Sequence, residues 1–145
     1  MSTILLTLDS LAGVTSYLEK SFEMIQKLQG ENVLLLDILD TAELELAEAQ
    51  DDDFLPALKK SKEAALEALL AQLQTRYPEV AIEASLQTGN PKRKIIDEAK
   101  RLNAELVISG SHQYSNLEYL LSHGSVAAYL AKHLPCDLLI LKGEV

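Results

Sequence analysis

Five short apolar runs alternate along the chain with segments whose apolar residues recur at helical spacing, and this order most restricts the possible folds. The apolar runs cover residues 4–8, 33–39, 80–86, 106–109 and 138–141. Strands that alternate with helices form parallel sheets with right-handed crossovers. The sequence therefore predicts one α/β domain over residues 1–145, an open parallel five-stranded sheet of order 3-2-1-4-5 with helices on both faces.

Four segments between these runs have the periodicity of helices. In the first, apolar residues recur at steps of three and four between residues 11 and 28, and Gly30 follows where a left-handed cap is expected. The second helix covers about residues 55–77, the third begins at Asn90 and Pro91, and the fourth covers about residues 125–132. The acidic segment 40–53 is consistent with a short helix or a loop.

Charge and cysteine content limit the classes of partner. With 22 Asp and Glu against 13 Lys and Arg, the formal net charge is −9, so neither nucleic acid nor an anionic membrane is expected to bind. Cys136 is the single cysteine, which excludes an intramolecular disulfide and fits a reducing compartment. Every long apolar run is interrupted by charge or glycine, and no basic leader is present. We expect a cytoplasmic protein without membrane insertion.

Glycine and polar residues lie between the fourth apolar run and the last helix. The run is followed by Gly110, Ser111 and His112, and the helix opens at Gly124, Ser125 and Val126. Backbone N–H groups of such a loop and the positive end of a helix dipole can hold a phosphate. The predicted sheet reverses direction between its first and fourth strands, where ligands of open α/β sheets bind. Asp9 and Ser10, after the first strand, and Ile38, in the second, belong to the same edge.

Five segments match, in register, the pattern of a known family. They are residues 4–9 (ILLTLD), 34–40 (LLLDILD), 88–91 (TGNP) followed by Ile95 and Ile96, 106–112 (LVISGSH) and 134–140 (LPCDLLI). Together they resemble the universal stress protein family over the whole length of the chain. By this resemblance, Asp9 and the backbone near Ile38 would hold the ribose and adenine of a nucleotide, and the glycine loop its phosphates.

The glycine loop departs from the family's nucleotide-binding pattern, which is glycine, two residues, glycine, nine residues, then glycine with Ser or Thr. Gly110 matches the first glycine, and Gly124 with Ser125 matches the final pair. Gln113 replaces the middle glycine, and the span is one residue longer. A Cβ at this position opposes positive φ and the close approach of a phosphate, although the Gln113 amide can replace part of the interaction.

The resemblance implies a cytoplasmic, homodimeric regulatory module of the stress response that binds ATP or AMP, with Mg²⁺ only where ATP is bound. The implied binding residues are Asp9, Ser10, Ile38, Gly110, Ser111, His112, Gln113, Gly124, Ser125 and Val126. No catalytic or metal-binding residue is predicted. In the simpler interpretation, Asp9 and Ser125 only cap the first and last helices.

Two other functions stay open. The first is a nucleotide-free stress protein that acts through protein contacts, for which Gln113 and the longer loop argue. The second is a weak ATPase or phosphotransferase. In each case we expect a homodimer through the exposed apolar edge of the last strand, which consists of Leu138, Leu139, Ile140 and Leu141. A regulatory protein partner is also expected, and the sequence does not identify it.

Three basic residues, Lys92, Arg93 and Lys94, occupy the first turn of the third helix, where positive charge opposes the helix dipole. Pairing with Asp97 and Glu98 at i, i+4 spacing would make them a solvated face. The alternative is a docking patch for an acidic partner.

Overall fold

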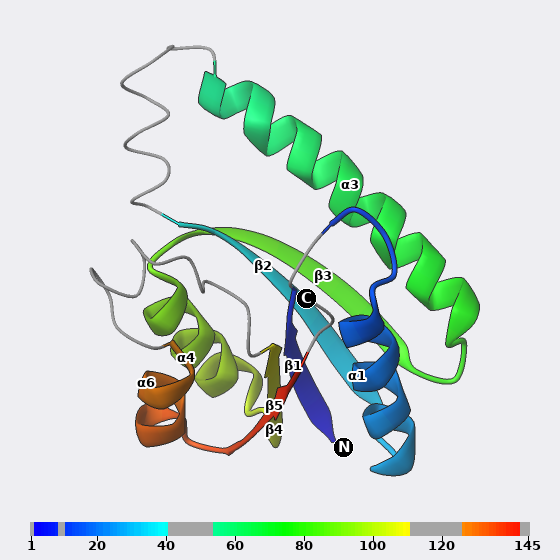
Figure 1. Cartoon of the computed structure of the whole chain (residues 1–145), viewed down its shortest axis with the longest axis vertical. Coiled ribbons are helices and arrows are strands. Elements are labelled where there is room, and N and C mark those ends of the chain that lie inside the picture. Colours follow the sequence, from blue (N-terminus) through cyan, green and yellow to red (C-terminus); the bar gives the residue numbers. More distant parts are fainter. Residues whose placement is uncertain (1, 9–10, 41–53, 111–125, 143–145) are drawn as a thin grey trace.

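The fold is built on one five-stranded sheet with helices against both faces (Figure 1). The computed structural model describes residues 2–8, 11–40, 54–110 and 126–142. The strands are β1 (Thr3–Thr7), β2 (Asn32–Asp40), β3 (Ala81–Gly89), β4 (Leu106–Gly110) and β5 (Asp137–Leu141). The helices are α1 (Ser16–Lys27), α3 (Phe54–Arg76), α4 (Pro91–Leu102) and α6 (Val126–His133). All strand pairs are parallel, and the order β3-β2-β1-β4-β5 confirms the predicted topology.

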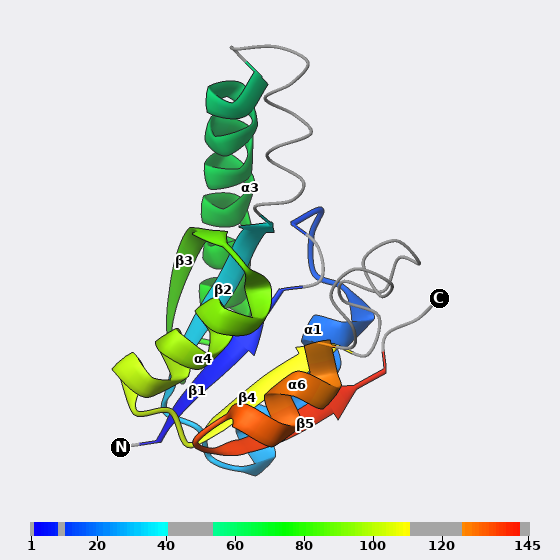
Figure 2. The same cartoon turned by 90° about the vertical axis from the view of Figure 1, so that its left-hand side faces the viewer.

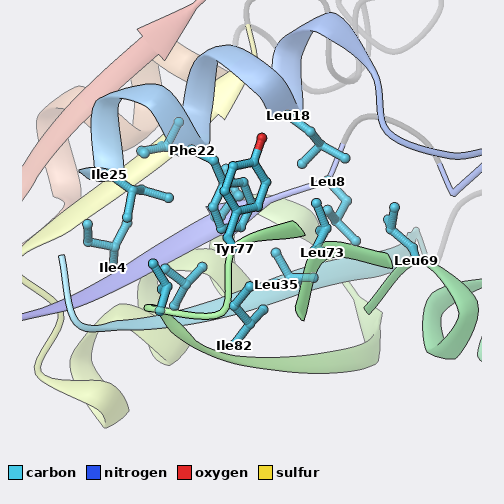
Figure 3. Packing of buried hydrophobic residues seen from close by; sticks show 14 of the residues in the cluster. Ile4, Leu8, Leu18, Phe22, Ile25, Leu35, Leu69, Leu73, Tyr77 and Ile82 are labelled. Carbon is cyan, nitrogen blue, oxygen red and sulfur yellow. The ribbon is translucent and has the colours of Figure 1, made fainter. Parts of the chain in front are cut away.

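Two hydrophobic clusters fill the space between the sheet and its helices. α1 and α3 cover one face, and α4 and α6 cover the other (Figure 1). In the first cluster the Phe22 and Tyr77 rings stack with centroids 4.4 Å apart (Figure 3). The same view shows Ile4, Leu8, Leu18, Ile25, Leu35, Leu69, Leu73 and Ile82 packed around them. Because helices cover both faces, the central strands are continuous apolar runs rather than alternating ones.

The start of α1 differs from the prediction. The Thr15 side chain accepts a hydrogen bond from the Leu18 N–H at 3.3 Å, which makes Thr15 the N-cap. Capping by a hydroxyl satisfies a backbone donor that the first helical turn leaves free. Leu11 and Val14 therefore precede the helix, although they do pack against the first cluster. The apolar spacing correctly predicted that Leu18, Phe22 and Ile25 are buried. Leu28 is 53% exposed, and the predicted start at residue 11 is wrong.

The end of α1 also differs from the prediction. Gln29, and not Gly30, has the left-handed backbone, with φ of 57°. The Gly30 N–H then donates to the carbonyl oxygen of Ile25 at 2.9 Å, which closes the helix end. A Cβ on Gly30 would lie 2.7 Å from Ile4 Cδ1 and 3.0 Å from Ile25 Cγ2. Glycine is needed here because the turn packs closely against β1.

α4 begins where the sequence predicts. Asn90 Oδ1 accepts hydrogen bonds from the backbone N–H groups of Lys92 at 3.0 Å and Arg93 at 3.4 Å. Neither predicted pair of this helix, Arg93 with Asp97 or Lys94 with Glu98, is among the ion pairs of the described residues, and Glu98 pairs instead with Arg101 at 2.7 Å. Hydrogen bonds from Arg101 hold the pKa of Glu98 below its usual value, and the charge of Lys94 acts in the same direction.

The edge of the sheet formed by the carboxyl ends of the strands is stepped. β2 and β3 stay paired up to Asp40 and Gly89, whereas β1 pairs with β2 only up to Thr7 and Leu36. α3, with 23 residues, projects past the strands at this edge (Figure 2). The step therefore lies at the end of β1. No helix in the described part of the chain has the length and hydrophobicity to cross a bilayer.

Candidate functional site

The end of β1 lies between two strands that continue beyond it. Leu6 pairs with Ile108 of β4, and Thr7 pairs with Leu36 of β2. Ile38 and Gly110 are each two residues farther along, so they flank the end of β1 about 10 Å apart, the width of two strand spacings. The helix that follows β1 covers one face, whereas the helix that follows β4 covers the other. This is the switch point where open α/β sheets bind ligands.

The backbone of Ile38 faces the space beyond β1. The Leu8 N–H donates to the carbonyl oxygen of Leu36 at 3.0 Å, so the polar groups of Leu36 point toward β1. Backbone groups of alternate residues point to the same side of a strand, and those of Ile38 therefore point the same way. β1 ends at Thr7, one residue short of Leu8. The carbonyl oxygen and the N–H of Ile38 thus offer an acceptor beside a donor at the switch point.

The carboxyl ends of β1 and β4 are joined by buried hydrogen bonds. Thr7 Oγ1 donates to the carbonyl oxygen of Ile108 at 3.3 Å. The buried Tyr17 hydroxyl lies 2.6 Å from the Thr7 carbonyl oxygen and 3.2 Å from that of Ile108. These contacts hold the two strand ends at one level directly below the switch point.

The first residue of α6 is anchored to the same core as Ile38. Val126 and Leu130 are buried in the cluster that also contains Ile38, between the sheet and the helices α4 and α6. A helix start carries free N–H groups and a positive partial charge, which favour an anion. Ile38, Gly110 and Val126 therefore lie toward one edge of the sheet, and their role in binding a ligand stays a prediction. The predicted residues Asp9, Ser10, Ser111, His112, Gln113, Gly124 and Ser125 lie outside the described residues.

A lysine and two aromatic rings meet beside this edge, in a contact that the sequence did not predict. Lys92 Nζ lies 5.2 Å from the centroid of the Tyr129 ring, and the His133 ring is 4.3 Å from that centroid. Lys92 comes from α4, whereas Tyr129 and His133 are one turn apart on α6. Sequence spacing could have suggested the contact between Tyr129 and His133. The contact with Lys92 depends on how the two helices pack.

Asp37 is a mostly buried carboxyl on β2, and its side chain lies on the face of the sheet that α3 covers. Lys62 Nζ of α3 lies 3.9 Å from its Oδ2 atom, which has no hydrogen-bond partner among the described residues. Burial raises the pKa of Asp37, whereas the Lys62 charge and the Ile38 N–H act in the opposite direction. Its side chain points toward α3, so we assign it no role in the candidate site.

Cys136 and the described acidic residues supply no second reactive centre. Burial, and then the charge of Asp137, raises the pKa of the Cys136 thiol. The thiolate is the nucleophilic form, so a raised pKa disfavours a catalytic cysteine. Across residues 2–8, 11–40, 54–110 and 126–142, no three His, Cys, Asp or Glu side chains are grouped to hold a metal ion.

A hollow of about 410 Å³ opens at the opposite edge of the sheet, between the last turn of α1 and the first residues of β4 and β5. Its lining is mainly apolar and includes Leu28, Leu138 and Leu139, together with the carboxylates Glu105 and Asp137. Two carboxylates repel a phosphate. The carboxyl edge therefore remains the better candidate for an anionic ligand.

The model of the universal stress protein family matches residues 1–142 of this chain. The chain belongs to the universal stress protein family. A universal stress protein of Staphylococcus aureus strain USA300 is 29% identical over 128 residues, which cover 83% of this chain and 72% of that protein.

Solved structures of universal stress proteins share the fold. One in complex with cAMP has a TM-score of 0.64 at 16% identity, covering 99% of this chain and 98% of its own. A family member from Arabidopsis thaliana with AMP bound has a TM-score of 0.63 at 19% identity, covering 100% of this chain and 94% of its own. At such identities the similarity shows the common fold of the universal stress proteins.

Proposed function

We propose that this universal stress protein is a cytoplasmic regulatory module that binds an adenine nucleotide, ATP or AMP, beyond the end of β1. The observation that carries the proposal is the orientation of the Ile38 backbone toward the switch point. Adenine presents an amino donor beside a ring-nitrogen acceptor. The carbonyl oxygen and N–H of Ile38 are the complementary pair.

The other proposed binding residues would contact the ribose and the phosphates of the nucleotide. Asp9 and Ser10 come directly after β1 in the sequence and would contact the ribose. Gly110 and the residues after it, Ser111, His112 and Gln113, would surround the phosphates together with Gly124 and Ser125, which precede Val126 of α6. Mg²⁺ would accompany ATP, because phosphate oxygens and water molecules supply most of its ligands. The solved relatives with cAMP and AMP bound support an adenine ligand.

The role we propose is binding and signalling rather than turnover, and the functional unit is a homodimer. β5 is an edge strand, and its Ile140 side chain is 41% exposed. An exposed apolar edge favours pairing with a second strand. A regulatory protein partner would then distinguish the nucleotide-bound dimer from the nucleotide-free dimer.

The test is mass spectrometry of nucleotide released by denaturing freshly purified protein. We expect close to one ATP or AMP per chain in the wild type and none in Gly124→Val, because an added branched side chain blocks a phosphate at the start of α6. Ala131→Val, at an exposed position of α6, is the matched control and should retain the nucleotide.

Each alternative has its own outcome. A wild-type protein without nucleotide, and without a thermal shift when ATP or AMP is added, contradicts the proposal. That result would support the nucleotide-free stress protein for which Gln113 argues. Release of ADP during incubation, abolished in Gly124→Val, would instead support a weak ATPase.

A further inference from the structure

The first turn of α4 carries a cation that lies over an aromatic ring rather than beside a carboxylate of the described residues. Lys92 is half-buried, and among the described residues no carboxylate lies within ion-pair distance of its Nζ atom. The chain as a whole has 22 acidic residues and a net charge of −9. The side chain therefore contributes local positive charge in a protein whose net charge is negative.

The ring of Tyr129 stabilises this cation without neutralising it. Lys92 Nζ lies 5.2 Å from the ring centroid, within the range of a cation–π contact. The His133 ring packs against Tyr129 at 4.3 Å and restricts its orientation. A carboxylate would cancel the field of the ammonium, whereas the quadrupole of an aromatic ring leaves most of it. The positive charge remains available to an anion.

The position of this charge relates it to the start of α6. α4 and α6 lie side by side on one face of the sheet (Figure 2). Tyr129 is three residues after Val126, a rise of about 4.5 Å along the helix axis. Helical side chains lean toward the N-terminus of their helix, which brings the ring closer still to the start of α6. The ammonium of Lys92 therefore lies over a ring that belongs to the first turn of α6.

We propose that Lys92, held by Tyr129, binds the terminal phosphates of the nucleotide and makes the site selective for ATP over AMP. This inference rests on the proposed function. The single phosphate of AMP is attached to the ribose and would stay near Gly110. The longer tail of ATP extends toward the start of α6 and carries additional negative charge, which the ammonium would neutralise.

Calorimetric titration of ATP and AMP into the wild type and Lys92→Gln tests the inference. Loss of one charged contact is expected to weaken ATP about tenfold and AMP less than about twofold, because only ATP reaches the ammonium. Lys92→Arg, which keeps the charge, should recover most of the ATP affinity. Lys100→Gln is the matched control, an exposed lysine two turns farther along α4, and should leave both affinities unchanged.

Tyr129→Leu provides a second measurement, since it removes the ring but not the charge. We expect a smaller loss that is again confined to ATP. The effect of Lys92→Gln should shrink at high salt because exposed charges are screened.

Unchanged ATP affinity in Lys92→Gln, or equal losses for ATP and AMP, would overturn the inference while leaving the proposed nucleotide site intact. A wild type that binds neither nucleotide would overturn both. Thermal denaturation of each variant separates a binding effect from loss of the fold.

Discussion

The buried hydroxyl of Tyr17 donates a 2.6 Å hydrogen bond to the carbonyl oxygen of Thr7, the last residue of β1. Tyr17 belongs to α1, so the bond ties the first turn of that helix to the end of the central strand. The same hydroxyl lies 3.2 Å from the Ile108 carbonyl oxygen of β4. One side chain thus links a helix and two strands at the switch point.

Tyr17→Phe removes this hydroxyl and keeps the ring. We expect the free energy of unfolding to fall by about 1–2 kcal/mol, because a buried hydrogen bond is lost and the acceptors stay desolvated. Urea denaturation gives the value. Tyr129→Phe, at a 40% exposed position, is the control and should change stability little. Equal effects of the two substitutions would contradict the assignment.

Gly30→Ala tests the close packing of the α1 turn on β1. The added Cβ would lie 2.7 Å from Ile4 Cδ1, and we expect a loss of about 1–3 kcal/mol from overpacking. Ile4→Val removes that methyl group, so the double mutant should lose less than the sum of the single losses. Additive losses in urea denaturation would show that contact with Ile4 is not the cause.

Because the Asp37 carboxyl is mostly buried, we expect the free energy of unfolding to depend on pH. The pKa of Asp37 is raised in the folded state, so its ionisation lowers stability above that pKa. Protonation restores stability as the pH falls toward 3.8, the ordinary pKa of an aspartate. We therefore expect Asp37→Asn to be more stable than the wild type at pH 7, by up to about 1 kcal/mol. The difference should disappear as the pH falls through the raised pKa.

Denaturation curves measured between pH 7 and pH 3 would follow this difference. Asp97→Asn, at an exposed position, provides the control for the loss of a carboxylate. A stability difference between Asp37→Asn and the wild type that stays constant over the whole range would contradict the prediction.

Ile140→Lys tests the homodimer proposed through β5. A charge on an apolar edge strand opposes edge-to-edge pairing, so the variant should sediment as a monomer at concentrations where the wild type is a dimer. Phe54→Lys alters a side chain that is 45% exposed at the start of α3, the helix that contacts β3 at the opposite edge of the sheet, and should leave the dimer intact. Identical sedimentation of both variants and the wild type would exclude this interface.

Much of the fold follows from local sequence patterns. The continuous apolar runs identify buried parallel strands because both faces of the sheet are covered, and Asn90 with Pro91 defines the start of α4 because capping is local. The place of the candidate site follows as well, since strand order determines the switch point. Ile38 was predicted from the family pattern, and the register of β1 and β2 then determined the direction in which its backbone groups point.

The boundaries of α1 and the chemistry beside the site depend on competing interactions that periodicity does not contain. Thr15 begins the helix and Gln29 takes the left-handed position, although Leu11 and Gly30 favoured other bounds. Lys92 belongs to a first turn whose charges suggested ion pairs within α4, yet it lies against Tyr129 of α6.

The sequence by itself determined the order of elements, the parallel sheet and the edge at which a ligand would bind, because these depend on hydrophobic periodicity and chain connectivity. Only the tertiary structure decided which charges are paired, which are buried and which stay available. Contacts such as Asp37 with Lys62 and Lys92 with Tyr129 join separate elements. Their geometry is determined by the packing of helices on the sheet, and no spacing along the chain encodes it.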